Sequence, residues 1–259
     1  MRIGHRAASR GDRGFTLIEL MIALLIGVFL LGALLTIVQT NRTVFGDQNK
    51  MAQLQDGERM AMTMMADVIQ SAGYFPQPYQ PYNNTLTGAL IAAPPFAAGA
   101  APFIAGQAFD GTYSAGAPGD AIAVRYMTAS GDNILNCTGL PNQSGANVLY
   151  INIFQVQQDA QGNWQLTCTV NGVQYNLVSG VTNLSVLYGV KQNAGTPGNS
   201  VDTYMNAQQV TALNLWSSVI SAMVQLTFNN PMYASNLTQP QYIYVQRVIS
   251  VMAQSGPME

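Results

Sequence analysis

Residues Phe15–Val38 form a run of 24 mainly apolar residues in which the only charged side chain is Glu19. As an α-helix such a run is about 36 Å long, which is enough to cross the hydrocarbon core of a membrane. A charged side chain at the bilayer centre costs about 2.5–3.5 kcal/mol on insertion scales, and less near the interface. The sequence therefore predicts a membrane-spanning helix over residues 15–38, and it requires either a partner for the Glu19 carboxylate or a way for it to reach water.

The two flanks of this run differ in charge. The C-terminal flank contains Arg42 and Lys50 with Asp47 between them. The N-terminal flank is strongly basic, with four arginines and the only histidine of the chain: Arg2, His5, Arg6, Arg10 and Arg13. Because basic flanks tend to remain in the cytoplasm, we expect the N-terminus to stay there and the remainder of the chain to cross the membrane.

The position of small residues around the run indicates which bond is cut. A secretory signal would carry an A-x-A-like cleavage site after its apolar segment, and residues 36–42 (TIVQTNR) have no such pattern. A small residue, Gly14, instead precedes the run directly after Arg13. A peptidase that cuts there retains the hydrophobic segment as the new N-terminus.

The stretch Gly14-Phe15-Thr16-Leu17-Ile18-Glu19, between a basic leader and an unbroken apolar helix, resembles the class III signal of type IV pilins and pseudopilins. This resemblance covers about residues 1–40. It implies that prepilin peptidase removes a leader of residues 1–14 after Gly14 and methylates the amino group of Phe15. It also implies an inner-membrane protein with a periplasmic domain that later joins a pilus fibre at the cell surface.

The resemblance further implies a role for Glu19, whose carboxylate pairs in such filaments with the Phe15 amine of a neighbouring subunit. A carboxylate and an amine that are both removed from water attract strongly, so pairing relieves both subunits. The alternative is that Glu19 extends to the cytoplasmic interface and has no other role. Glu19 lies only about 6 Å along the helix from Phe15, so this alternative is physically feasible.

The charge composition bears on whether the protein binds nucleic acid. Only 8% of the residues are charged, against roughly 25% in an average soluble domain. The first 14 residues hold four of the ten basic and one of the twelve acidic side chains, so the remainder carries six basic against eleven acidic groups. This balance leaves no basic patch for several phosphates, and we predict no nucleic-acid partner.

Two cysteines, Cys137 and Cys168, are present. A pair of cysteines in an exported chain predicts a disulfide, which on the chain-entropy model stabilises a loop of this length by about 3–4 kcal/mol. The mature chain would contain no histidine, and neither cysteine belongs to a C-x-x-C motif. We therefore expect neither a zinc site nor any other metal or cofactor.

The helix is expected to continue beyond the membrane, because residues 41–72 contain no proline. Apolar residues recur there at three-, four- or seven-residue spacing, as in an amphipathic helix: Met51, Leu54, Ala61, Met65, Val68 and Ala72. Gly73, followed by Pro76, Pro78 and Pro81, is expected to end it, which gives a helical segment over residues 15–73. Residues 74–120 hold seven of the twelve prolines and are expected to form an irregular connection.

Residues 121–259 are expected to form a β-rich domain. Segments rich in β-branched and aromatic residues predict the strands Ala121–Tyr126, Val148–Val156, Trp164–Val170, Val173–Val178, Leu184–Val190, Val219–Phe228 and Tyr242–Met252. Residues 202–212 are expected to form one helix with Asp202 near its cap. The predicted fold class is α+β, a long N-terminal helix packed on an antiparallel, mainly meandering sheet.

A second resemblance involves the later segments. Residues 180–190 (GVTNLSVLYGV), then Tyr204-x-x-Ala207, then residues 216–226 (WSSVISAMVQL) are similar to the PilW minor pilins. The same order also resembles the minor pseudopilin J of type II secretion. The resemblance to PilW implies a structural subunit whose partners are other minor and major pilins, the prepilin peptidase and the inner-membrane assembly machinery.

An enzyme is not expected. The sequence contains no G-x-S-x-G, P-loop or paired-carboxylate signature, and Asp110, Asp120, Asp132, Asp159 and Asp202 stand among Gly, Asn and Ser, which are residues of turns. A calcium site at residues 110–112 or 131–133 is the less favoured interpretation, because neither segment has an alternating series of oxygen ligands. Two hypotheses remain: a minor pilin that helps to nucleate or cap a pilus, and a membrane-tethered module that binds a sugar or another surface ligand.

Overall fold

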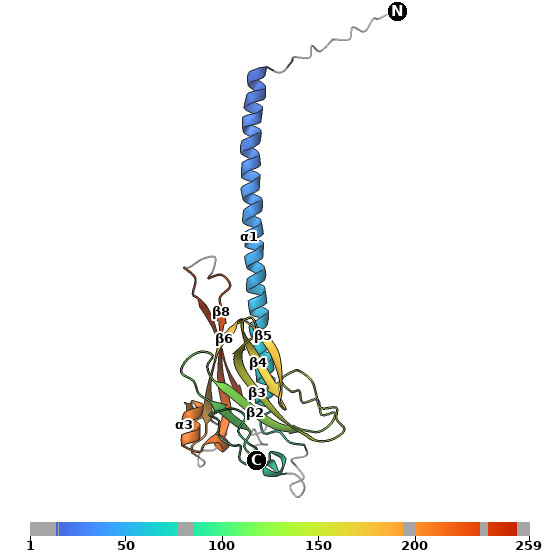
Figure 1. Ribbon diagram of the computed structural model, residues 1–259, viewed down its shortest axis with the longest axis vertical. Helices are drawn as coiled ribbons and strands as arrows, with labels where there is room; N and C mark the ends of the chain where they lie inside the picture. Colours follow the sequence, from blue (N-terminus) through green and yellow to red (C-terminus); the bar gives the residue numbers. More distant parts are fainter. Residues whose placement is uncertain (1–13, 15, 77–84, 194–199, 234–237, 253–259) are drawn as a thin grey trace, which may run out of the picture. The chain divides into compact units, whose positions relative to one another are not determined.

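The computed structural model describes residues 14, 16–76, 85–193, 200–233 and 238–252. The fold is α+β: one long helix, α1 (Leu17–Gln70), precedes a domain built mainly from antiparallel strands (Figure 1). The chain divides into two compact units, residues 1–50 and 51–259, so α1 begins in the first unit and ends in the second. At 54 residues α1 is about 81 Å long.

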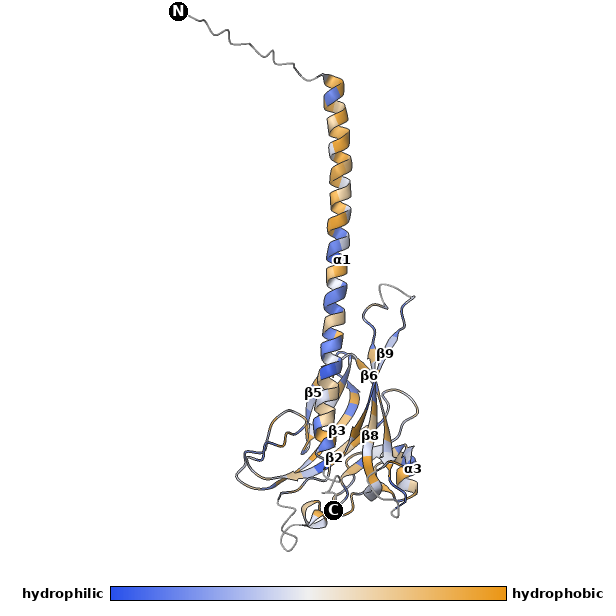
Figure 2. Ribbon diagram, turned by 180° about the vertical axis from the view of Figure 1, so that it is seen from behind, coloured by the Kyte–Doolittle hydropathy of each residue, from blue (hydrophilic) through white to orange (hydrophobic). Residues whose placement is uncertain are grey.

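The two halves of α1 differ in surface. Figure 2 shows the first half of α1 as almost uniformly hydrophobic and the second half as mixed. In the second half the expected apolar stripe is confirmed at Ala61, Met65 and Val68, which are buried, and at Leu54, which is partly buried against the same core. Ala72 is also buried but follows the end of α1, and Met51 is only half-buried. This stripe attaches the helix to the strands that follow.

The first sheet is a five-stranded meander in the order β1-β2-β3-β4-β5, and every neighbouring pair is antiparallel. Its strands are β1 (Phe109–Thr112), β2 (Ala121–Thr128), β3 (Val148–Gln158), β4 (Trp164–Val170) and β5 (Val173–Ser179). Four of these were predicted. β1 was not, and it lies inside the 74–120 segment that was expected to be irregular, as does the one-turn helix α2 (Leu86–Ala89).

The second sheet has four strands in the order β7-β6-β8-β9. They are β6 (Val181–Val190), β7 (Thr203–Met205), β8 (Val219–Asn229) and β9 (Tyr242–Ser250), with a 3₁₀ turn at Trp216–Ser218 ahead of β8. The expectation of one mainly meandering sheet is therefore wrong in number, since the first five strands form the meander and the last four form a separate sheet.

The predicted helix over residues 202–212 is also wrong in extent. Thr203–Met205 pair with β6 as β7, and the helix α3 is confined to Ala207–Ala212. Asn206 caps α3 through a capping box with Gln209. The Asp202 carboxylate instead accepts hydrogen bonds from the backbone N–H groups of Gln192 and Asn193, at 2.8 and 2.9 Å.

The two sheets meet at the segment that precedes β2. Gly119 forms a parallel bridge to Leu184 in β6, where the backbone N–H of Asp120 donates to the Leu184 carbonyl at 2.7 Å. A Cβ atom at Gly119 would collide with the Leu184 carbonyl oxygen, and its φ of +92° also favours glycine. The Asp120 carboxylate reinforces the junction by accepting from the N–H of Val186 in β6 and the N–H of Ser114. Both sheets and the end of α1 share one hydrophobic core.

Candidate functional site

The start of α1 is held by a side chain of the motif itself. The hydroxyl of Thr16 accepts a hydrogen bond from the backbone N–H of Glu19 at 3.4 Å, and the Thr16 carbonyl accepts from the N–H groups of Glu19 and Leu20. A threonine one residue before a helix satisfies an otherwise unpaired N–H in this way, so Thr16 defines the helix start. Gly14 lies exposed before this start, where the backbone is not helical.

Glu19 is the acidic residue in the first turn of α1 and is exposed to the surroundings. Its carboxylate has no hydrogen-bond or ion-pair partner among the residues that the structure describes. The positive end of the helix dipole favours a carboxylate at this position by about 0.3–1 kcal/mol, which is less than the cost of a charge inside a bilayer. Phe15, the other half of the predicted pair, lies outside the described residues.

The other polar groups of the apolar segment are satisfied within the helix. The Thr36 hydroxyl donates to the Gly32 and Ala33 carbonyls at 3.0 and 2.8 Å, and the Thr40 hydroxyl donates to the Thr36 carbonyl at 2.9 Å. Such bonds allow hydroxyl groups to sit in an apolar environment. Glu19 is therefore the polar side chain of this segment that still needs a partner.

The described residues contain one helix that is long and apolar enough to cross a membrane, and this helix is α1. None of its most apolar 18-residue stretch is buried by the rest of the chain. Leu17, Leu25 and Phe29 are examples, with 79%, 72% and 77% of their surfaces exposed. An apolar surface of this extent requires lipid or other apolar helices around it.

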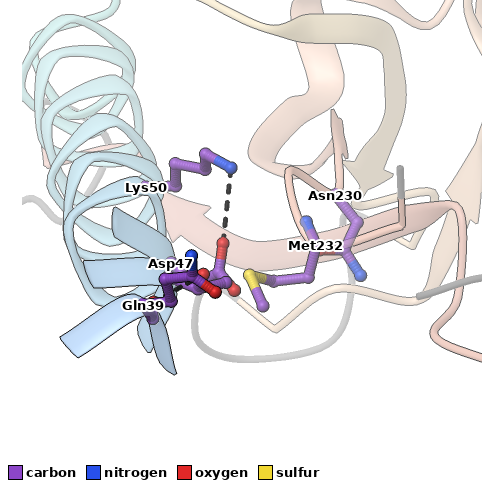
Figure 3. A network of polar contacts seen from close by, with 6 residues as sticks. Gln39, Asp47, Lys50, Asn230 and Met232 are labelled. Atoms are coloured by element: carbon purple, nitrogen blue, oxygen red, sulfur yellow. Dashed lines mark hydrogen bonds and ion pairs between the residues drawn. The ribbon is translucent and has the colours of Figure 1, made fainter. Parts of the chain in front are cut away.

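Charged residues return where the apolar segment ends. Lys50 forms an ion pair with Asp47 one turn earlier at 3.3 Å (Figure 3), and Arg59 forms a similar pair with Asp56 at 3.0 Å. Exposed pairs of this kind contribute little to stability, about 0–1 kcal/mol. They show that charged side chains are found on α1 only after its most apolar stretch, apart from Glu19.

Cys137 and Cys168 form the predicted disulfide, with both side chains buried and their Cα atoms 6.3 Å apart. The bond joins the connection between β2 and β3 to strand β4. The N–H of Cys137 also donates to the side-chain oxygen of Asn152 in β3 at 2.9 Å. The disulfide therefore attaches the long connection between β2 and β3 to the first sheet.

Two family models match the chain over separate segments. Residues 9–35 match the prokaryotic N-terminal methylation motif, and residues 153–256 match type IV pilus-assembly protein W, PilW. The chain is a type IV pilin-like protein. The methylation-motif match includes Gly14, Phe15, Glu19 and the first turns of α1, whereas the PilW match begins within β3 and runs beyond β9. No curated protein and no solved structure matches the chain.

The pilin-like chain also contains buried charges that were not predicted as a group. Arg125 in β2 is fully buried, and its guanidinium donates to the carbonyl groups of Gln107, Ile91 and Ile104 at 2.7–3.2 Å. The same group lies 4.2 Å from the centre of the Phe103 ring. Arg125 thus holds the 90–107 segment of the pilin-like chain against its first sheet.

Asp110 in β1 is the nearest acidic counterpart of Arg125. It is fully buried, one of its oxygens accepts from the N–H of Gly111 at 2.8 Å, and the other has no partner among the described residues. Burial raises the pKa of Asp110 to about 6, although the Gly111 N–H and the charge of Arg125 oppose this rise. The turn interpretation is therefore wrong for Asp110, whereas Asp132 and Asp159 do cap turns.

These carboxylates do not gather into a site for a metal. Among the residues that the structure describes, no group of three or more His, Cys, Asp or Glu side chains lies close enough to hold an ion. The N-terminal part of α1 is an exposed apolar surface that carries the Glu19 carboxylate in its first turn, without a partner among the described residues, and this arrangement suits association with other apolar helices.

Proposed function

We propose that the chain is a minor pilin that contributes to the assembly and initiation of a type IV pilus. Prepilin peptidase cuts after Gly14 and methylates Phe15, and the mature subunit then joins other minor and major pilins at the inner-membrane assembly machinery. The match of residues 153–256 to a pilus-assembly family supports this role. The observation that carries the proposal is the lone Glu19 carboxylate, which lacks a described partner on an otherwise apolar and exposed helix surface.

The partner that fits Glu19 is the Phe15 ammonium of a neighbouring subunit. Within one chain the two groups are separated by a rise of about 6 Å, so subunits that pair them are staggered along the filament axis rather than level. In a low-dielectric surrounding, each charge is costly alone and their mutual attraction is strong, so the pair forms only when two helices pack side by side. Packing also covers the apolar surface of α1.

The same proposal includes the orientation of the protein in the membrane and the compartments through which it passes. The N-terminus remains in the cytoplasm, the domain folds in the periplasm where its disulfide can form, and the subunit then enters the fibre at the cell surface. A buried Cys137–Cys168 bond fits an oxidising compartment. The four arginines ahead of the apolar run fit the same orientation.

Substitution of Glu19 tests the proposal. We expect Glu19→Ala to insert into the membrane and to be cleaved, but to enter pili at least about tenfold less than the native subunit, because a tenfold change corresponds to only about 1.4 kcal/mol. Glu19→Asp keeps the carboxylate and should retain a measurable part of the incorporation. The readouts are immunoblots of sheared pili and of membranes.

Mass spectrometry of the mature N-terminus controls for processing. Methylated Phe15 in both variants would show that the loss arises at assembly and not at cleavage. Equal incorporation of Glu19→Ala and the native subunit would contradict the proposed pair. A purified protein that begins at Met1, or that has lost the apolar segment, would contradict the proposal as a whole.

A further inference from the structure

A groove lies where the two sheets of the domain meet. It has a volume of about 470 Å³ and contains residues from β4, β6, β8 and β9 together with Ala117. Three aromatic side chains line it: Trp164, Tyr242 and Tyr244. Tyr242 and Tyr244 leave 37% and 64% of their surfaces exposed, although both stand on a regular strand.

The remaining lining consists of uncharged hydrogen-bonding groups. The amide and hydroxyl residues of the lining are Asn183, Asn229, Thr182 and Thr227. None of the described residues that line the groove carries a charge. Because side chains alternate along a strand, Arg247 of β9 lies on the opposite face from Tyr242 and Tyr244.

The groove has a rigid frame. The backbone N–H of Gly180 donates to the Trp164 carbonyl at 2.8 Å, and the N–H of Asn229 donates to the Gly180 carbonyl at 3.0 Å. The Thr182 hydroxyl donates to the Thr227 carbonyl at 3.2 Å. These bonds connect three of the lining strands, so the groups are held in place before any ligand arrives.

Polar groups continue from the groove along the outer face of the second sheet. Cross-strand register places Asn183, Thr227 and Tyr244 in one row. Ser185, Gln225 and Gln246 form the next row on the same face, because they lie two residues further along their strands. An extended ligand that leaves the groove in this direction would meet further amide and hydroxyl groups.

We infer that this groove binds a neutral saccharide chain. A pyranose ring has one face of C–H groups that packs on the negative face of an aromatic ring, and hydroxyl groups around its edge that need both donors and acceptors. Asn and Thr side chains supply both functions. The groove combines these two requirements and lacks the cationic groups that would select an acidic sugar. Saccharide recognition goes beyond the proposed assembly role and does not depend on it.

A second observation concerns Asn183 itself. Its side-chain oxygen is buried beside Gly119 and has no hydrogen-bond partner among the described residues. This oxygen is closed off from the groove as well as from water, so Asn183 lines the groove only through the more exposed part of its side chain. The surrounding Tyr and Trp rings supply the contact area.

The test uses the full chain in lipid nanodiscs, since maltoside and glucoside detergents are themselves saccharides. The probes are cellotetraose and chitotetraose, with tetragalacturonate as the acidic comparison. We expect saturable binding of at least one neutral probe by saturation-transfer NMR, with a dissociation constant on the order of 1 mM, and at least about tenfold weaker binding of tetragalacturonate.

Variants locate the site. Tyr244→Ala should weaken binding of the neutral probe at least about tenfold, whereas Tyr244→Phe should retain it because the ring face remains. Tyr175→Ala, which removes another exposed tyrosine from β5, is the matched control and should leave binding unchanged. The mostly exposed position of Tyr244 makes its substitution safe for folding, which a thermal unfolding curve verifies.

Three results would overturn the inference. They are the absence of saturable binding to either neutral probe, equal binding by Tyr244→Ala and the native protein, and equal or stronger binding of tetragalacturonate. If Tyr244→Ala instead lowers incorporation into pili while neither probe binds, the groove is a contact between subunits and the saccharide inference fails. Failure of Glu19→Ala to affect assembly would leave this inference intact, so the two proposals are separable.

Discussion

Single residues of the domain carry charges in places where water is excluded. Arg125 is buried among backbone carbonyl groups of the 90–107 segment, and its guanidinium donates hydrogen bonds to them. Asp110 sits in the neighbouring strand with one unpartnered oxygen. The cost of burying Asp110 as a carboxylate is therefore only partly offset, and its pKa rises to about 6.

The stability of the domain should consequently depend on Asp110 between about pH 4 and pH 6. The folded pKa lies above that of an unfolded aspartate, about 3.9, so the folded state binds the proton more tightly and stability falls as the pH rises through this range. We expect a fall on the order of 1–3 kcal/mol in the native chain and a smaller fall in Asp110→Asn. Urea unfolding at a series of pH values measures this difference.

Other carboxyl groups also contribute to the change of stability with pH. Burial also raises the pKa values of Asp120 and Glu58, so Asp110→Asn should reduce the slope without abolishing it. Asp159→Asn is the control. Hydrogen bonds from Asn163 lower the pKa of this exposed carboxyl group, so its removal should not reduce the fall in stability with rising pH. The same slope in Asp110→Asn as in the native chain would rule out this assignment.

At the scale of elements, sequence pattern located most strands but missed those that depend on distant partners. The strand β4 begins and ends where its apolar and β-branched residues predicted. The strand β1 contains Asp110 and Gly111, which have low β-propensity, and it forms because β2 pairs with it. The Asn206-x-x-Gln209 capping box was present in the sequence and would have separated β7 from α3.

The N-terminal site remains a prediction, and it rests on a motif that is contiguous in the sequence. Gly14, Phe15 and Glu19 are close in sequence, so no tertiary structure is needed to bring them together. The groove shows the reverse case, since Trp164, Asn183 and Tyr244 come from three strands of two sheets. Residues of this kind have no common signature in a single sequence.

Close packing of α1 on β5 gives a prediction at the scale of elements. A Cβ atom at Gly57 would lie 3.1 Å from a Val178 side-chain carbon, which is tighter than an ordinary contact. Gly57→Leu should therefore destabilise the domain by about 1–3 kcal/mol despite the higher helix propensity of leucine. Thermal unfolding measures the change.

A double-mutant cycle with Val178→Ala tests whether this contact is the cause. Truncation of Val178 makes room, so Gly57→Leu should cost less in the Val178→Ala background, with an interaction energy of about 0.5–3 kcal/mol. Additive effects of the two substitutions would show that α1 does not pack closely on β5 at this point.

At the scale of the whole molecule, the sheet arrangement depends on long-range contacts that local pattern does not contain. The bridge between Gly119 and Leu184 joins the loop before β2 to a strand of the other sheet. The glycine was visible in the sequence, but its partner was not. The disulfide between Cys137 and Cys168 was predicted because an exported chain with two cysteines offers only one intramolecular pairing.

The same disulfide reports the orientation of the protein in the membrane. If the four arginines before Gly14 hold the N-terminus in the cytoplasm, the domain reaches an oxidising compartment. Cys137 and Cys168 then form a disulfide and do not react with maleimide. Replacement of Arg2, Arg6, Arg10 and Arg13 by Glu should retain a fraction of the domain in the cytoplasm, where both cysteines stay reduced. When the protein is denatured and treated with polyethylene-glycol maleimide, that fraction should gain two labels, whereas Cys137→Ser with the native N-terminal segment should gain one.

The reduced fraction should also be degraded faster, because the chain-entropy model assigns the disulfide about 3–4 kcal/mol of stability. Pulse-chase labelling measures this rate. Full protection of both thiols in the charge-reversed chain would show that the arginines do not set the orientation.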